Sequence, residues 1–216
     1  MAAQIHAFPV PAAPGLAPGA RMPARTGVSW RPKAQPKRGI IIDLDDTLYP
    51  RERFELDAAE VTHMLRVFRT HDPSLWLPYE SGEALRRLRA DGWRIAILTN
   101  GLPSVQAAKV AALAVAPMVD QVVYADAVVP GGKPAPEAFA AALELLDVPA
   151  SRCVMVGDDP AADIDGGRAA GLRTVRLTRP GVTVTPGHEA DVILYDIHLL
   201  PSAARAALDM VTLDVA

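Results

Sequence analysis

Short runs of apolar, mostly β-branched residues alternate along this chain with segments whose apolar residues recur at helical spacing. The apolar runs predict buried strands at 39–42, 94–98, 121–124, 153–156, 174–177 and 192–194. The segments between them predict helices at 81–91, 104–113, 136–146, 161–170 and 202–208. Regular alternation of strand and helix is typical of an α/β fold. We therefore expect a doubly wound parallel sheet whose ligand site lies at the carboxyl ends of the strands.

Serine and glycine residues mark the expected ends of these helices. Ser81, Ser104 and Ser202 stand where helices could begin, because a serine side chain can cap the free N–H groups of a first turn. Gly92 and Gly171 stand where helices should end, because glycine accepts the left-handed backbone that is common there.

The first 42 residues differ from the rest of the chain in charge and in proline content. They contain no acidic residue and six basic ones, and seven of the chain's 20 prolines fall before residue 38. Proline removes backbone donors and interrupts both helices and sheets, so residues 1–37 are predicted to be a disordered, basic tail rich in proline and alanine. This tail lacks the continuous apolar core of a secretory signal. Residues 38–216 are then predicted to form the folded domain.

Residues 49–79 interrupt the alternation directly after the first predicted strand. Within them, residues 57–69 carry apolar side chains at the spacing of one helix face. Because this segment follows the carboxyl end of a strand, we expect it to form a small helical cap insert over the ligand site rather than padding.

Composition excludes several classes of protein. A formal net charge of −3 over 216 residues gives no general attraction to nucleic acid or to anionic membranes, and no apolar run is long enough to span a bilayer. Cys153 is the only cysteine, which excludes an intrachain disulfide and a cysteine-cluster zinc site and is typical of a reducing compartment. We therefore expect a soluble, cytoplasmic protein, and whether it forms a homodimer stays open.

Polar side chains follow the first two predicted strands. Asp43, Asp45 and Asp46 crowd the end of the first strand, and such crowding is costly unless a cation or a shared proton relieves it. Thr99 and Asn100 follow the second strand, where they add a hydroxyl and an amide at the same edge. Taken alone, each group could be an ordinary polar cap of a strand end.

A lysine and further carboxylates complete this edge of the sheet. Lys133 precedes a predicted helix, near an N-terminus that favours anions. Asp158 and Asp159 follow the fourth strand, and Asp163 lies at the start of the next helix. Taken alone, Lys133 could be a solvated charge and the aspartates a helix cap. Together with the groups above, they place carboxylates, a hydroxyl and a cation at the carboxyl ends of four strands.

These four groups of residues resemble the four motifs of the haloacid dehalogenase-like hydrolase superfamily. The similarity is carried by Asp43-x-Asp45-x-Thr47, by Thr99-Asn100, by Lys133 before Pro134, and by Gly157-Asp158 with Asp163 five residues later. Residues 43–50 are similar to the branch that includes pyrimidine 5′-nucleotidases and other small-metabolite phosphatases, although the length of residues 49–79 predicts a shorter cap than in that branch. The resemblance implies the fold of that superfamily and a Mg²⁺-dependent phosphatase, which acts on a small phosphorylated metabolite of the nucleotide or sugar phosphate class.

The resemblance also implies a role for each carboxylate. Asp43 is expected to attack phosphorus and form an aspartyl-phosphate, and Asp45 to protonate the leaving oxygen and then activate water. Mg²⁺ is expected to bind the carboxylates of Asp43 and Asp158 and the backbone carbonyl of Asp45. Either Asp159 or Asp163 is expected to support the metal from a second layer of contacts. Such an oxygen-only donor set suits Mg²⁺.

The remaining motif residues are expected to hold the phosphate. Thr99 and Asn100 would bind phosphoryl oxygens, and Lys133 would neutralise the charges of both the phosphate and the nucleophile, which otherwise repel each other.

Other activities stay open beside phosphate-ester hydrolysis. An acid at Asp45 favours ester hydrolysis over dehalogenation, because a halide leaves without a proton whereas an alkoxide needs one. The remaining alternatives are a phosphotransferase or mutase on the same scaffold, a phospho-signalling receiver domain, and a non-catalytic module that binds a phosphorylated ligand.

Overall fold

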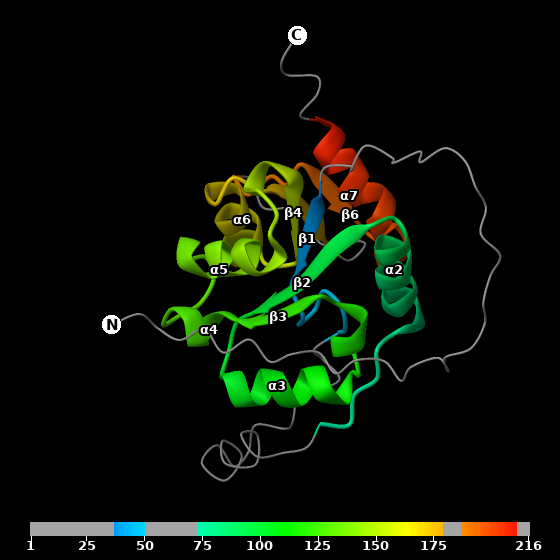
Figure 1. Cartoon of the computed structure of the whole chain (residues 1–216), viewed down its shortest axis with the longest axis vertical. Helices are drawn as coiled ribbons and strands as arrows, with labels where there is room; N and C mark the ends of the chain where they lie inside the picture. Colours follow the sequence, from blue (N-terminus) through cyan, green and yellow to red (C-terminus); the bar gives the residue numbers. More distant parts are fainter. Residues whose placement is uncertain (1–36, 51–72, 179–186, 211–216) are drawn as a thin grey trace, which may run out of the picture.

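Within residues 37–50, 73–178 and 187–210, which the computed structural model describes, six parallel strands form one sheet in the order β3-β2-β1-β4-β5-β6 (Figure 1). They span β1 Arg38–Ile42, β2 Trp93–Thr99, β3 Gln121–Tyr124, β4 Cys153–Gly157, β5 Arg173–Leu177 and β6 Val192–Leu194. Every predicted strand is present, and each lies within one residue of its expected ends. The predicted doubly wound α/β fold is confirmed.

β1 lies in the middle of the sheet because its three isoleucines can be buried on both faces. Ile40, Ile41 and Ile42 are wholly buried, and the strand pairs with β2 on one side and with β4 on the other. From β1 the chain builds outward through β2 and β3, and then returns to add β4, β5 and β6 on the opposite side. The reversal between β1 and β4 is a topological switch point, where sheets of this kind bind their ligands.

Helices cover both faces of the sheet (Figure 1). The α-helices are α2 Tyr79–Ala90, α3 Pro103–Ala112, α4 Ala125–Val128, α5 Pro136–Leu146, α6 Gly166–Ala169 and α7 Leu200–Asp209, and short 3₁₀ helices lie at Ala116–Met118, Ala150–Arg152 and Ile197–Leu199. α2 and α7 pack with the face that carries Ile40 and Ile42, whereas α5 packs with the face that carries Ile41. The loop that leaves β1 is therefore anchored to a strand buried between two apolar layers.

Proline, rather than serine, marks the start of two predicted helices. Pro103 is the first residue of α3 and Pro201 is the second residue of α7, and neither helix has a side-chain cap. Ser104 and Ser202, which were expected to begin these helices, therefore lie inside the first turn. Proline is tolerated there because the N–H that it lacks has no partner within the helix.

Ser81 has a role that differs from the expected cap. It lies inside α2, and its buried hydroxyl donates to the Leu48 carbonyl at 2.8 Å, so it ties the helix to the loop after β1. The expected helix ends are confirmed, because Gly92 and Gly171 follow α2 and α6 with φ values of +79° and +80°.

The helix predicted after β4 is two different helices. A π-helical turn, Pro160–Asp165, comes first and α6 follows it. The Ile164 N–H bonds the Asp159 carbonyl, five residues earlier, at 3.3 Å, which is the π pattern. This turn brings Asp163 so close to the end of β4 that a Cβ on Gly157 would overlap the Asp163 carboxylate. Glycine at that position therefore lets the acid lie against the sheet.

Residues 1–36 of the predicted tail and residues 51–72 of the predicted cap lie outside the described residues. The ends of the cap segment belong to the α/β body, because Tyr49 is buried with the α2 face of the core and Tyr79 begins α2. The cap itself and the division of the chain after residue 37 stay predictions. None of the described helices is both long enough and apolar enough to cross a membrane.

Candidate active site

The loop after β1 turns back sharply at the switch point. The Asp43 N–H still pairs with the Val156 carbonyl of β4 at 2.8 Å, so the sheet fixes this residue. The Leu48 N–H then bonds the Leu44 carbonyl at 3.0 Å, and Asp46 takes a φ of +55°. Aspartate tolerates this left-handed conformation better than most residues. The loop consequently leaves its carboxylates at the edge of one cavity.

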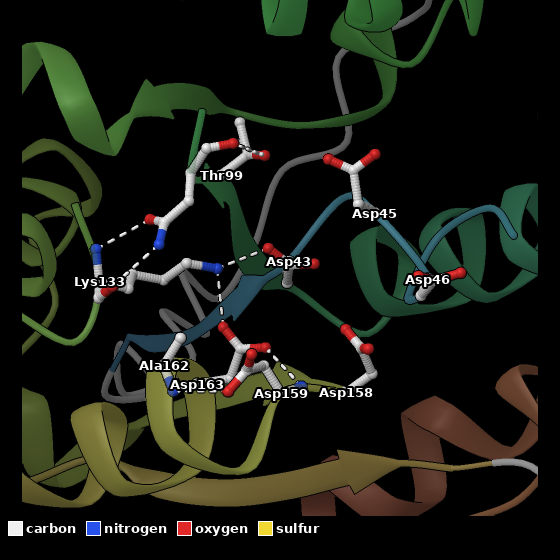
Figure 2. Close-up of a pocket in the computed structure, with 10 residues that line it drawn as sticks. Asp43, Asp45, Asp46, Thr99, Lys133, Asp158, Asp159, Ala162 and Asp163 are labelled. Atoms are coloured by element: carbon white, nitrogen blue, oxygen red, sulfur yellow. Dashed lines mark hydrogen bonds and ion pairs between the residues drawn. The ribbon is translucent and has the colours of Figure 1, made fainter. Parts of the chain in front are cut away.

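A cavity of about 130 Å³ lies at this edge of the sheet (Figure 2). It is lined by all eight predicted site residues, Asp43, Asp45, Thr99, Asn100, Lys133, Asp158, Asp159 and Asp163, and also by Asp46 and Ala162. These residues come from the ends of β1, β2 and β4, from the loop before α5 and from the π-helical turn Pro160–Asp165. The structure therefore brings the predicted residues together, although their contacts differ in part from those expected.

Lys133 joins two carboxylates in this cavity. Its Nζ lies 2.5 Å from Asp43 Oδ1 and 2.7 Å from Asp163 Oδ1. The side chains of Lys133 and Asp163 are only 2% and 1% exposed. Because a buried charge is stable only when it is paired, the lysine and the two acids depend on one another.

Burial and mutual repulsion disfavour the ionised carboxylates here. Burial raises the pKa of Asp43 to about 7, although Lys133 acts in the opposite direction. Burial, together with the charges of Asp43 and Asp46, raises the pKa of Asp158 to about 6. Burial likewise raises the pKa of Asp163 despite its contact with Lys133. The ammonium of Lys133 therefore does not balance the acids around it, and the site lacks positive charge at neutral pH.

Three of these acids are spaced so that they could hold a cation. One carboxylate oxygen from each of Asp43, Asp158 and Asp163 lies within 4.8 Å of the others. The Thr47 hydroxyl donates to Asp158 Oδ1 at 3.3 Å and helps to orient it. Asp163, which was expected only as a support, is thus a member of the cluster. The Asp45 side chain is not a member of this cluster, and the expected role of its backbone carbonyl as a metal ligand stays a prediction.

Asp45 points away from this cluster and has partners of its own (Figure 2). Lys109 Nζ lies 2.6 Å from its Oδ1, Gln106 Nε2 donates to its Oδ2 at 2.7 Å, and the Tyr49 hydroxyl also donates to Oδ1. Burial opposes ionisation of Asp45, but the Lys109 charge and these hydrogen bonds outweigh it and hold the pKa of Asp45 below its usual range.

Gln106 and Lys109 are site residues that the four motifs do not contain. Both lie on α3, where they are only 2% and 4% exposed. They share the buried face of that helix with Val105 and Val110. Polar residues at the apolar positions of a helix that directly follows a site strand are the signal that could have found them.

Thr99 and Asn100 differ in what their side chains bind. Gln106 Nε2 also donates to Thr99 Oγ1 at 2.5 Å, so the amide links Thr99 to Asp45. The Asn100 carboxamide donates to the Lys133 carbonyl and accepts from the Lys133 N–H, both at 2.8 Å. The Asn100 side chain therefore fixes the lysine loop, and its predicted contact with a phosphoryl group would have to come from its backbone.

Either Asp159 or Asp163 was expected to support the metal site, and the structure gives each of them a different part of that task. Asp159 is exposed, and its Oδ1 accepts hydrogen bonds from the N–H groups of Ala161 and Ala162 at 2.9 and 2.8 Å. This is the ordinary capping role of an aspartate at a helix start. Its own N–H donates to Asp163 Oδ2 at 3.1 Å. Asp163 therefore reaches the cluster, and Asp159 orients it through the backbone.

Comparison with known families gives one match that covers more than half of the chain. A model of the family described as haloacid dehalogenase-like hydrolase matches residues 51–171. The matched range contains Thr99, Lys133 and Asp163, and it begins after the loop that carries Asp43 and Asp45.

Curated phosphatases are similar to part of the chain. The ribulose-1,5-bisphosphate 5-phosphatase of Halopiger xanaduensis is 42% identical over 96 residues, which are 44% of this chain and 40% of that protein. The phosphoserine phosphatase of Thermus thermophilus is 38% identical over 103 residues, which are 47% of this chain and 41% of that protein. The chain therefore spans about two fifths of the length of these relatives.

A solved structure described as a HAD phosphatase, from Thermococcus onnurineus, has the same fold. The two structures superpose with a TM-score of 0.61 at 19% sequence identity, over 76% of this chain and 96% of that chain. At this identity the likeness concerns the fold alone.

Proposed function

This chain belongs to the haloacid dehalogenase-like hydrolase family, and we propose that it hydrolyses phosphate monoesters of small metabolites through an aspartyl-phosphate on Asp43. The observation that carries the proposal is the buried ion pair between Lys133 and Asp43 at the switch point. A cation at that place can offset the charge of a phosphate group and of a carboxylate that attacks it. The phosphatase names of two curated relatives support the same class of reaction.

Asp43 is the proposed nucleophile because the sheet fixes it and Lys133 contacts it. One of its carboxylate oxygens would form a bond to phosphorus while the bond from phosphorus to the ester oxygen breaks. Thr99 and Lys133 line the same cavity and would bind the phosphoryl oxygens. Water would then hydrolyse the aspartyl-phosphate, which releases inorganic phosphate and restores the Asp43 carboxylate.

Asp45 is the proposed acid and base. It lines the same cavity, where it would give a proton to the leaving ester oxygen and later take one from the attacking water. In the free protein the pKa of Asp45 lies below its usual range, which suits the base. The negative charge of a phosphate bound nearby would raise the pKa of Asp45 and so favour the acid.

The chemistry of the acidic cluster fits Mg²⁺. Asp43, Asp158 and Asp163 offer oxygen ligands within 4.8 Å of one another, and hard oxygen donors suit this ion. The raised pKa values of these acids are what repulsion and burial produce when positive charge is lacking. We propose that these carboxylates, with the Asp45 backbone carbonyl, hold Mg²⁺, which when bound would supply positive charge for the phosphoryl oxygens.

The substrate is proposed only as a class. The two relatives are named for a sugar bisphosphate and for phosphoserine, which share a phosphate ester on a small, polar leaving group. A nucleotide or a sugar phosphate is the substrate class that we propose for this chain.

A phosphate-release screen tests the proposal. Purified protein with Mg²⁺ would be assayed on nucleotides, sugar phosphates, phosphoglycolate and amino-acid phosphates. We expect release from at least one of these esters, and an acid-quenched sample should show one added phosphoryl group on the peptide that contains Asp43. The variant Glu144→Gln, which changes an exposed carboxylate on α5, serves as the control and should behave as wild type. No release from any ester, or release without phosphorylation of Asp43, would overturn the proposal.

A further inference from the structure

We infer that Gln106 and Lys109 of α3 are positioning residues that hold the Asp45 carboxylate away from the metal-ligand cluster and on the Thr99 side of the cavity. There it can serve the leaving group. The inference rests on the proposed function, because Asp45 has a leaving oxygen to protonate only if the protein cleaves a phosphate ester.

Both oxygens of the Asp45 carboxylate are held from α3. Lys109 Nζ binds Oδ1 at 2.6 Å and Gln106 Nε2 binds Oδ2 at 2.7 Å. Two contacts to different oxygens fix the rotation of a carboxylate as well as its position. Figure 2 shows the result, because Asp45 points away from Asp158 and Asp163.

The amide of Gln106 also ties this carboxylate to the proposed phosphate site. The same Nε2 atom lies 2.5 Å from Thr99 Oγ1, which lines the cavity. The position of Asp45 is therefore set relative to Thr99, and through it relative to a bound phosphoryl group. An acid that protonates the leaving oxygen needs this kind of fixed placement.

Burial of Gln106 and Lys109 costs free energy that a purely structural role would not require. Gln106 and Lys109 are 2% and 4% exposed, on a helix face that otherwise buries Val105 and Val110. Apolar side chains could fill the same space without the cost of taking an ammonium out of water. Among the described residues, Lys109 and Gln106 both contact Asp45, and Gln106 also contacts Thr99, and both partners are proposed site residues.

Charge gives the reason to restrain Asp45. A cation held by Asp43, Asp158 and Asp163 would attract any free carboxylate nearby, and Asp45 is only two residues from Asp43. Lys109 supplies a positive charge of its own, so Asp45 is paired before a metal arrives. The acid and the metal ligands thus remain separate groups within one small cavity.

The test compares two esters that differ in their need for an acid. p-Nitrophenyl phosphate has a leaving group that departs without a proton, whereas glycerol 2-phosphate releases an alkoxide that needs one. The quantity measured is kcat/KM, which covers the steps up to transfer of the phosphoryl group to Asp43. We expect Lys109→Met and Gln106→Leu to lower kcat/KM for glycerol 2-phosphate at least about tenfold more than for p-nitrophenyl phosphate.

Rescue and coupling separate positioning from damage to the helix. Lys109→Arg keeps the charge and should keep the wild-type ratio of the two esters within about threefold. In an Asp45→Asn background, Lys109→Met should cost less than about twofold for either ester, because it acts through the missing carboxylate. Val110→Ala, a buried neighbour on the same helix, is the control and should affect both esters equally.

The outcomes distinguish this inference from the proposed function. Equal losses on both esters in Lys109→Met and Gln106→Leu, or a full additional loss in the Asp45→Asn background, would overturn the inference alone. A wild-type protein that hydrolyses neither ester in Mg²⁺, nor any ester of the wider screen, would overturn the proposed function and the inference with it.

Discussion

Two buried lysines of this site contact aspartates whose pKa values are shifted in opposite directions. Lys133 contacts both Asp43 and Asp163, yet burial raises the pKa of Asp43 to about 7. Lys109 contacts Asp45, and the pKa of that carboxyl lies below its usual range. The distance from ammonium to carboxylate is nearly the same at the two places, at 2.5 and 2.6 Å. A close lysine is therefore not enough to fix the charge of an aspartate.

The surroundings of the two pairs explain the difference. Asp43 shares its lysine with Asp163 and has the Asp158 carboxylate nearby, so one ammonium stands beside a cluster of three acids. Asp45 has additional hydrogen bonds from Tyr49 and Gln106, and its side chain is more exposed, at 18% against 11%. The first group has room for another positive charge, whereas the second is already balanced. This comparison is why we place the metal with the first group and the acid with the second.

The largest test of the comparison replaces the aspartate of each pair. Asp43→Asn should lower kcat by about four orders of magnitude or more, because it removes the nucleophile while it preserves shape. Asp45→Asn should lower it by about two to four orders of magnitude, because it removes an acid and base, and should leave Mg²⁺ affinity nearly unchanged. Phosphate release and Mg²⁺ titration of both variants measure this, and circular dichroism checks their folding. A collapse of Mg²⁺ affinity in Asp45→Asn would show that the Asp45 carboxylate belongs to the metal site, which contradicts the comparison.

A second test uses pH and metal together. The folded pKa values of Asp43 and Asp158 are about 7 and about 6, against an ordinary value of 3.8. Between pH 4 and pH 7 the folded protein therefore keeps protons that the unfolded chain has lost, so the contribution of these acids to stability falls as pH rises. Asp45, with a lowered pKa, contributes in the opposite direction and only at more acid pH.

Melting curves of EDTA-treated protein measure this effect. Mg²⁺ should raise the melting temperature more at pH 7.5 than at pH 5, because at pH 5 it competes with bound protons. At a hundred times the dissociation constant the gain at pH 7.5 should be about 2.7 kcal/mol. Chelation should also silence phosphate release, and added Mg²⁺ should restore it. The same stabilisation by Mg²⁺ at both pH values would show that Asp43 and Asp158 are already ionised at pH 5, which contradicts their raised pKa values.

A third test displaces Lys133 from its two aspartates, Asp43 and Asp163, without removing a charge. Gly132 has a φ of +58°, and a Cβ there would overlap the Asn100 carboxamide that holds the Lys133 backbone. Gly132→Ala should therefore displace the lysine and raise KM about tenfold. Gly131→Ala is the matched control, because Gly131 has a φ of +88° but no atom within 4 Å of its Cβ position. Both variants carry backbone strain of about 1–3 kcal/mol, so equal KM values would contradict the role of Asn100.

The smallest expected effect belongs to Tyr49. Tyr49→Phe keeps the buried ring and removes one of the donors to Asp45. One hydrogen bond is worth about 1 kcal/mol, so kcat/KM for an alkyl phosphate should fall about fivefold or less. Phe139→Leu, on the opposite face of the sheet, gives a control for loss of core packing. A loss as large as that of Asp45→Asn would mean that the tyrosine, rather than α3, holds the acid.

The sheet and the membership of the site could be predicted because both follow from local patterns. Apolar runs such as 40–42 have few alternatives to a buried strand, and parallel strands bring their carboxyl ends to one edge. The part that each residue plays within the site could not be predicted in the same way. The spacing of Asp158, Asp159 and Asp163 does not reveal which acid faces inward, since the π-helical turn decides it.

The sequence patterns also could not predict which side chains form ion pairs across the site. Lys109 lies 64 residues from its partner Asp45, and nothing local connects the two. The helix starts were misplaced for a different reason, because the prolines next to Ser104 and Ser202 set the first turn more strongly than a serine cap does.

The place of β1 in the sheet has a consequence for the protein as it is synthesised. One neighbour, β2, leaves the ribosome soon after β1, but the other, β4, begins only at Cys153, about 110 residues after the end of β1. At about 5–20 residues per second, one edge of a strand with three consecutive isoleucines stays without its partner strand for roughly 5 to 20 s. An exposed apolar edge of this kind pairs readily with other chains. Slower translation between β1 and β4 should therefore lengthen the period of aggregation risk and increase the dependence of this protein on chaperones.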